Sequence, residues 1–172
     1  MRKKIEESYR MRTLGEEFNF LIDEYDFELI EKKDEFWFLK LVFKNPTVGV
    51  IISDERREQY VDVDICRLVN GKLIDNTAQA LKTEESLNCI SLNSIIRVTN
   101  PDDAIMPAHY HDESSGFFAP GGDSRYYRLI AEKLGKYALS FLLGDLSGFE
   151  ELAIKVKKFY QKNIADHEGN QP

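Results

Sequence analysis

The stretch "EFWFLKLVFKNPTVGVIISDERREQYVDVDICRL", residues 35–68, decides the fold of this 172-residue chain. Near its end, apolar and acidic side chains alternate strictly. One face carries Val61, Val63 and Ile65, and the other carries Asp62 and Asp64. This alternation is typical of an antiparallel strand that packs one face on a core and leaves the other in water. We therefore predict such a strand here, with its acids solvated.

The same stretch predicts further strands of a meander. Residues 36–44 are apolar on both faces at their start, which indicates a central strand, and the "NPT" turn leads into the next one. A shorter candidate covers residues 27–33, while Asn70-Gly71, a type I′ turn signal, predicts a return strand over residues 72–74. The side chains expected to be mostly buried are Trp37, Leu39, Leu41, Phe43, Val61, Val63 and Ile65.

Helical spacing flanks this meander on both sides. Thr13 and Glu16 form a capping-box pattern, which predicts an amphipathic helix over Leu14–Tyr25. The caps of three later helices are expected at Ser91, at Asp123 or Ser124, and at Ser147. Before the last of these, Gly144 is expected to end the preceding long helix, and Glu150 completes a second capping box.

The order of these elements predicts a single α+β domain over residues 1–172. Its centre is an antiparallel β-meander of four to five strands, preceded by one helix and followed by two to three helices. Residues 1–12 and 165–172 are expected to be frayed tails. No internal repeat and no linker divides the sequence.

Charge and hydropathy exclude several classes of partner. The chain has 30 acidic and 23 basic residues, a formal net charge of −7, so it lacks the surplus of cations that binding to nucleic acid needs. No apolar run approaches the roughly 18–20 residues of a membrane span. The acidic balance instead favours attraction of another protein with a basic surface. No cofactor is expected.

The two cysteines, Cys66 and Cys89, do not have the spacing of metal ligands. Cys66 lies in an apolar run, where a buried free thiol is the ordinary interpretation. The basic N-terminal stretch has no apolar core after it, unlike a secretory signal. We therefore expect a cytoplasmic protein with reduced cysteines.

One candidate metal or catalytic site lies in the 102–113 segment, which contains His109, His111, Asp112 and Glu113. Histidines two residues apart point to opposite faces of a strand, and only a bent loop could bring both onto one ion. We therefore expect an irregular loop over residues 107–122, with Phe117 or Phe118 packed against the domain or a partner. A metal-dependent enzyme or regulator is the alternative.

Acidic and aromatic side chains are the candidate partner-binding groups. An acidic loop with aromatic anchors is typical of protein-binding surfaces, and the "SDERREQYVDVD" stretch adds a second set of acids. The candidate residues are Asp54, Glu55, Asp62, Asp64, Asp112, Glu113, Phe117 and Phe118. No catalytic constellation accompanies them, because there is no "GxSxG" elbow and no complete phosphate-loop motif.

Four segments, "FNFLIDEYDFEL", "DERREQYVDVDICRL", "ISLNSIIRV" and "LLGDLSGFEEL", resemble those of a loose family of small bacterial proteins of unknown function. Small acidic proteins of this kind are in turn similar to the immunity proteins of bacterial toxin systems. The resemblance implies an α+β fold and a non-enzymatic, toxin-neutralising binding role. It implies no particular functional residues.

Overall fold

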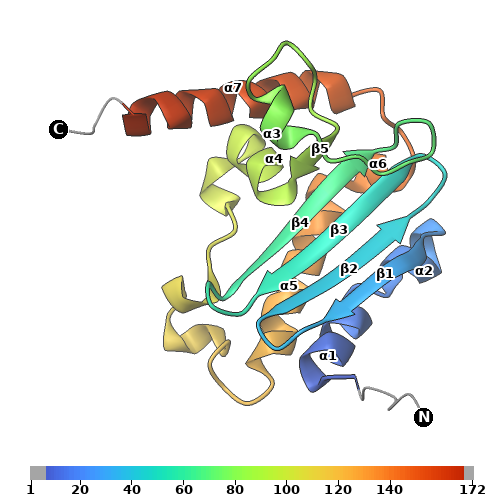
Figure 1. The fold of residues 1–172 in the computed structure, drawn as a ribbon. Helices are drawn as coiled ribbons and strands as arrows, with labels where there is room; N and C mark the ends of the chain where they lie inside the picture. The colour runs from blue at the N-terminus through green and yellow to red at the C-terminus, as the bar shows by residue number, and fades with distance from the viewer. Residues whose placement is uncertain (1–6, 169–172) are drawn as a thin grey trace.

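The computed structural model describes residues 7–168 and confirms the α+β class (Figure 1). Five strands form one antiparallel sheet in the order β1-β2-β3-β4-β5, so every strand pairs with its neighbour in the chain. The strands are β1 (Glu28–Asp34), β2 (Phe38–Lys44), β3 (Val48–Glu55), β4 (Tyr60–Arg67) and β5 (Cys89–Ser91). The predicted meander is therefore confirmed, with a different fifth strand.

Helices cover one face of this sheet along most of its length (Figure 1). They are α1 (Tyr9–Glu17), α2 (Phe20–Tyr25), α3 (Thr77–Ala80), α4 (Leu92–Thr99), α5 (Gly122–Tyr137), α6 (Leu139–Leu142) and α7 (Phe149–Glu168). Single 3₁₀ turns η1 (Pro101–Asp103), η2 (Ala108–Tyr110) and η3 (Glu113–Ser115) interrupt the connection between α4 and α5. Within residues 7–168, no helix has the length and apolar character needed to cross a bilayer.

The core lies between the sheet and these helices. Leu39, Leu41 and Phe43 of β2 and the alternating apolar residues of β4 are all buried, as the period of two predicts. Trp37 is the exception, since 49% of its surface is exposed. β2 begins only at Phe38, which leaves Trp37 in the turn between β1 and β2, where alternation no longer determines burial.

The helical segment before the sheet begins earlier than the capping-box pattern predicted. Ser8 caps α1 by accepting a hydrogen bond from the Met11 N–H at 3.2 Å. Thr13 lies inside the helix, where its hydroxyl donates to the Tyr9 carbonyl. Residues 9–12 are thus helical rather than frayed, as are residues 165–168 at the end of α7. The outer parts of both predicted tails lie outside the described residues.

The turn after β4 forms as expected, but the return strand over residues 72–74 does not. Asn70 and Gly71 both have positive φ angles, as a type I′ turn requires, and Val69 and Lys72 form one isolated bridge. Beyond it, the Leu73 side chain packs against the sheet at Gly49, where a Cβ atom would collide with it. The chain then passes through α3 before β5 pairs with β4.

The interpretation of Cys66 as a free thiol is wrong, because its sulfur is bonded to that of Cys89. The two residues are directly opposite in β4 and β5, with Cα atoms 4.0 Å apart. In the adjacent pair, the Arg67 N–H donates to the Asn88 carbonyl. Because hydrogen-bonded and non-hydrogen-bonded pairs alternate along an antiparallel ladder, the two cysteines form a non-hydrogen-bonded pair, in which side chains are closest. Sequence spacing could not reveal this pairing, because β5 was not predicted.

The predicted capping box at Ser147 is also wrong. The backbone N–H of Ser147 donates to the Asp145 carboxylate at 2.9 Å, forming a local turn, and α7 begins at Phe149.

The boundaries of α5 also differ from the prediction. This helix ends at Tyr137 rather than at Gly144, which follows α6 with φ 84°. Gly121 rather than Asp123 or Ser124 caps α5. The Ser91 cap is confirmed by its bond from the Ser94 N–H.

Candidate functional site

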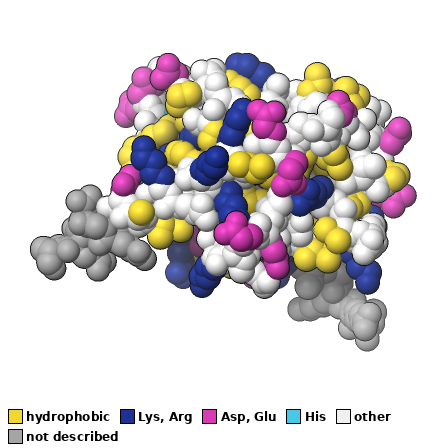
Figure 2. Space-filling view, turned by 90° about the horizontal axis from the view of Figure 1, so that it is seen from above, with side chains coloured by type: hydrophobic (Ala, Val, Ile, Leu, Met, Phe, Trp, Pro, Cys, Tyr) yellow, Lys and Arg dark blue, Asp and Glu magenta, His cyan; other side chains and the backbone are white. Residues whose placement is uncertain are grey.

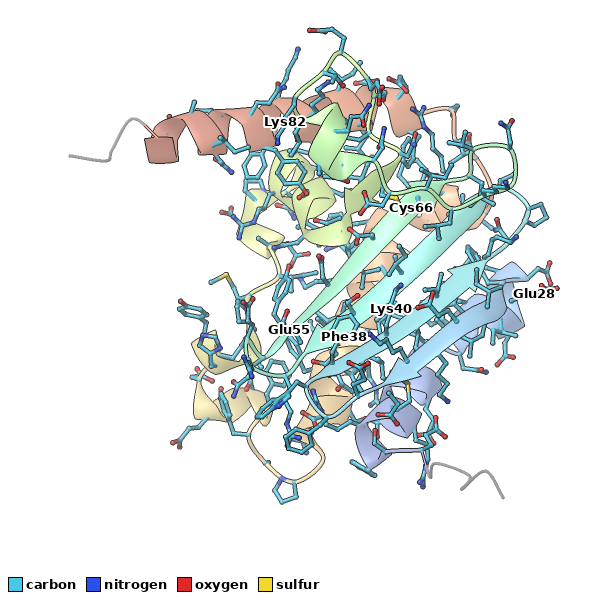
Figure 3. All side chains as sticks on the ribbon, viewed as in Figure 1. Glu28, Phe38, Lys40, Glu55, Cys66 and Lys82 are labelled. Atoms are coloured by element: carbon cyan, nitrogen blue, oxygen red, sulfur yellow. A yellow bond between two sulfur atoms is a disulfide. The ribbon has the colours of Figure 1, made fainter. Side chains whose placement is uncertain are left out.

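Two turns lie side by side at one end of the sheet. Phe38 and Glu55 are directly paired there, so the β1–β2 turn and the β3–β4 turn both project from this end (Figure 3). The Arg56 N–H donates to the Trp37 carbonyl at 3.0 Å and joins the two turns. We call residues 35–37 and 56–59 the paired turns.

The 107–121 loop packs beside these turns as a third segment. The Ala108 N–H donates to the Gln59 carbonyl at 2.9 Å, and the Tyr126 hydroxyl of α5 donates to the Met106 carbonyl at 2.9 Å. Phe117 turns inward and lies 5.2 Å from the Tyr126 ring, centroid to centroid. These contacts position the loop against both the sheet and α5.

The three segments enclose a pocket of about 290 Å³, large enough for one or two side chains. Its lining includes Trp37 and Gln59 of the paired turns, Ala108 and Phe118 of the 107–121 loop, and Tyr126 of α5. We call this cavity the hairpin-tip pocket. Five of the eleven lining residues are aromatic and four are charged, so apolar ring surface and polar groups that could orient a ligand or an anchoring side chain lie together in the wall.

The floor of the pocket is a buried polar cluster of Arg10, Asp54 and Tyr127, and only 2% of the Asp54 surface is exposed. One carboxylate oxygen, Asp54 Oδ2, accepts hydrogen bonds from Arg10 Nη2 and from the Tyr127 hydroxyl. Asp123 lies close to the same guanidinium, with Oδ2 3.6 Å from Arg10 Nε. The cluster links α1, β3 and α5 beneath the pocket.

Burial dominates the electrostatics of this cluster. It raises the pKa of Asp54, an effect that the Tyr127 hydrogen bond and the Arg10 charge offset only in part. Burial is the largest single influence on Arg10 and lowers its pKa, but the contributions of Asp54, Tyr127 and Asp123 together outweigh it, so the pKa of Arg10 is raised. The pKa of Tyr127 is raised by burial and by the Asp54 charge. A neutral tyrosine and a cationic arginine therefore face the pocket.

Exposed aromatic side chains lie at the pocket and beside it, since Trp37 and Phe118 line it and Phe36 packs against Trp37. Phe36, Trp37 and Phe118 are between 49% and 69% exposed, and we call these three residues the aromatic rim. The Phe36 and Trp37 rings meet edge to face at 4.6 Å. Large exposed aromatic groups around a cavity are unusual on a surface that contacts only water.

The predicted partner-binding acids are dispersed over the molecule. Asp54 is buried in the pocket floor and cannot present its charge on the surface, because Arg10 and Tyr127 occupy it. Glu55 ends β3 beside the paired turns and is exposed. Asp112 and Glu113 are exposed on the 107–121 loop, where Asp112 caps η3 through the Ser114 N–H.

The two predicted phenylalanines have different environments. Phe117 is half-buried and packs on Tyr126 and on His111, whereas Phe118 is 56% exposed on the aromatic rim. The expectation that one of them packs against the domain is confirmed for Phe117. Phe118 presents its ring to solvent, while Phe117 forms part of the pocket lining.

Asp62 and Asp64 lie on the other face of the sheet. Cross-strand pairing places Asp62 beside Ser53, and Asp64 beside Ile51 and Ser91, on a face without helices over its lower part (Figure 1). Both carboxylates are half-buried rather than fully solvated. Burial raises the pKa of Asp64 to about 7, with further contributions from the charges of Asp62 and Asp75.

This environment makes folding stability depend on pH. An unfolded aspartate has a pKa of about 3.9, so the folded state retains a proton on Asp64 that the unfolded state has lost. The resulting stabilisation is present below about pH 4 and is lost as pH rises through 7. The free energy of unfolding of the wild type should therefore fall between pH 5 and pH 8. In Asp64→Asn, whose side chain cannot ionise, we expect this fall to be smaller by about 2 kcal/mol.

Urea denaturation of the wild type and the variant at both pH values measures this difference. Glu24→Gln, a substitution at an exposed position of α2, is the control and should leave the pH dependence unchanged. Equal pH dependence in the wild type and Asp64→Asn would contradict the assignment.

The candidate metal ligands do not converge. The exposed His109 ring stacks beside Tyr110, while His111 packs on Phe117 and Tyr126 and its Nε2 atom is buried without a hydrogen-bond partner. Asp112 is engaged with Ser114. Within residues 7–168, no group of three or more histidine, cysteine, aspartate or glutamate side chains is arranged to hold a metal ion.

Several pocket residues were not singled out from the sequence. Arg10 lies within residues 1–12, which the sequence predicts to be a tail, and Trp37 is expected inside a strand.

The opposite end of the molecule, around α7, lacks such a concentration of one residue type. Figure 2 shows basic and acidic side chains interspersed on that face, with apolar groups scattered between them. A pocket of about 380 Å³ there is lined by Lys157, Thr83 and Glu85, and Lys157 donates hydrogen bonds to the carbonyls of the other two.

No family model matches the chain, and no curated protein or solved structure is significantly similar to it.

Proposed function

We propose that this protein is a non-enzymatic binding module that covers the surface of another protein with its aromatic rim and hairpin-tip pocket. The observation that carries the proposal is that two exposed aromatic side chains, Trp37 and Phe118, line one pocket, and a third, Phe36, packs against Trp37. Tryptophan and arginine are enriched among the few residues that supply most of the binding energy at protein interfaces. The buried cluster below gives the surface a rigid base.

The electrostatics support a protein partner. Glu55, Glu58 and Glu113 are exposed near the pocket, and the chain carries a net charge of −7. Such a field attracts a partner with an overall basic surface over distances of about one Debye length. A toxin-neutralising role of the immunity type is one form of this function, supported by the chain's small size, acidity and α+β architecture.

The proposal is tested by comparing two matched variants. Phe36→Ala with Trp37→Ala removes the exposed aromatic area at the paired turns, while Ile154→Ala with Ile164→Ala removes exposed apolar area on α7. Both pairs lie on the surface, so both proteins should remain folded. Affinity capture from the native cells, with quantitative mass spectrometry, then identifies proteins that the wild type retains.

We expect a true partner to be retained by the wild type and by the α7 variant and lost with the aromatic variant. With that partner purified, the dissociation constant of the aromatic variant should rise about 30-fold or more, which corresponds to about 2 kcal/mol. A partner that binds both variants equally would place the interface elsewhere. Circular dichroism of each variant confirms that folding is not the cause.

A further inference from the structure

Two arginines of the β3–β4 turn lie against the aromatic rings of the β1–β2 turn. The Arg56 guanidinium carbon is 4.9 Å from the Phe36 ring centroid, and that of Arg57 is 5.1 Å from the Trp37 ring centroid. Both are within the range of a cation–π contact. We call Arg56 and Arg57 the arginine pair.

Neither member of the arginine pair forms an ion pair with another residue in the range 7–168. Arginines elsewhere do, since Arg67 binds Glu150 at 2.7 Å and Arg128 binds Glu17 at 2.9 Å. Glu55 and Glu58 flank the arginine pair in the sequence, yet their carboxylates lie more than 4 Å from both guanidinium groups. Among the described residues, the N–H donors of both guanidinium groups are therefore free of carboxylate partners.

A stacked arginine differs from a free surface lysine or arginine. The aromatic ring covers one face of the planar guanidinium and restricts its rotation, while the N–H groups at its edge remain available. These donors match the two oxygens of a carboxylate in a bidentate geometry. Because the side chain is already positioned, less conformational entropy is lost on binding.

We infer that the arginine pair binds a carboxylate of the partner protein, contributed by an aspartate or glutamate next to an apolar side chain that enters the hairpin-tip pocket. Arg56 also lines the pocket, so a carboxylate bound to it would lie at the pocket mouth. This inference rests on the proposed function and specifies its anchor. The net charge of the protein acts at long range, whereas this contact acts at hydrogen-bond distance.

A protein carboxylate fits better than a nucleic acid or an anionic bilayer. Both of those present many negative charges together, and the net charge of −7 and the exposed Glu55, Glu58 and Glu113 would repel them. A single carboxylate contacts only the arginine pair and avoids that repulsion. The adjacent aromatic rim supplies apolar contact for the neighbouring side chain.

Selection of a displayed library of random linear peptides against the purified full-length protein tests the inference. Four immobilised proteins are compared: the wild type, Trp37→Ala, Arg56→Gln with Arg57→Gln, and the control Arg12→Gln with Arg97→Gln. The control arginines are exposed and form no ion pair among the described residues. Synthetic peptides from the selection, labelled with fluorescein, are then titrated with each of the four proteins, and fluorescence anisotropy is the readout because Trp37→Ala lacks the single tryptophan of the chain.

We expect the selected peptides to share an aspartate or glutamate next to an aromatic or aliphatic residue. Substitution of the arginine pair should weaken their binding about 10- to 100-fold, as expected for loss of hydrogen bonds to a charged group, and the control should not. Changing the peptide carboxylate to its amide should produce the same loss, and the two losses should not add.

Three results would overturn the inference, and they are distinguishable. Peptides that depend on Trp37 but contain no acid would refute the carboxylate anchor while leaving the proposed function standing. Failure to select any peptide that depends on Trp37 would count against both. Binding of the wild type to phosphatidylserine vesicles, lost in the arginine variant, would instead identify a membrane surface as the occupant.

Discussion

Asp54→Ala should lower the free energy of unfolding by about 3–5 kcal/mol, the largest effect that we expect from a single substitution. The change leaves the Arg10 guanidinium, whose side chain is 19% exposed, without its closest counter-charge. It also removes the acceptor of the Tyr127 hydroxyl. A buried charge and a buried donor would both lose their partners in one step.

Urea denaturation at pH 7 measures this effect, with Asp123→Ala as the control. Asp123 also lies near Arg10 but is 52% exposed, so its loss should change stability by no more than about 0.5 kcal/mol. Asp54→Asn, which retains an acceptor for Tyr127 but not the charge, should fall between them. An Asp54→Ala variant as stable as Asp123→Ala would contradict the description of the pocket floor.

Reduction of the Cys66–Cys89 disulfide should lower the unfolding free energy by about 3 kcal/mol. The bond closes a loop with a sequence separation of 23, and a cross-link of that length reduces the conformational entropy of the unfolded chain by about this amount. The closed loop contains α3 and the carbonyls that accept hydrogen bonds from Lys157 of α7. Reduction should therefore loosen the α7 end more than the paired turns.

Denaturation of the oxidised protein with and without a reductant tests this expectation, and thiol titration of the denatured protein reports the state of both cysteines. Cys66→Ser with Cys89→Ser is the control and should be insensitive to the reductant. Two titratable thiols before any reductant is added would contradict the disulfide. An unchanged denaturation midpoint after complete reduction would contradict its stabilising effect.

The sheet could be predicted from the sequence because its signals are local. Alternation over residues 61–65 determines which side chains of β4 face the core, and Asn70-Gly71 identifies the turn that follows. Ser91 likewise marks the start of α4. The capping-box pattern at Ser147 predicted the wrong start for the last helix. The Ser147 N–H is hydrogen-bonded to the Asp145 side chain, and a capping-box pattern does not detect such a competing local hydrogen bond.

The candidate site could not be predicted in the same way, because its groups are distant in the sequence. Arg10 and Asp54 are 44 residues apart, and Asp54 and Tyr127 are 73 residues apart. Periodicity also could not locate the boundary at which β2 begins, so it assigned Trp37 to the core. Only the three-dimensional arrangement brings the paired turns, the 107–121 loop and α5 together around one pocket.

Hydrogen–deuterium exchange of the protein alone and in complex with its captured partner tests the central claim most directly. We predict slower exchange at the paired turns and in the 107–121 loop, because a partner seated on the aromatic rim would shield these backbone amides from water. Exchange in α3 and α7, which lie at the other end of the sheet, should stay the same (Figure 1). Protection of α7 or of the helix-free face of the sheet, with the paired turns unchanged, would contradict the claim that the hairpin-tip end is the binding surface.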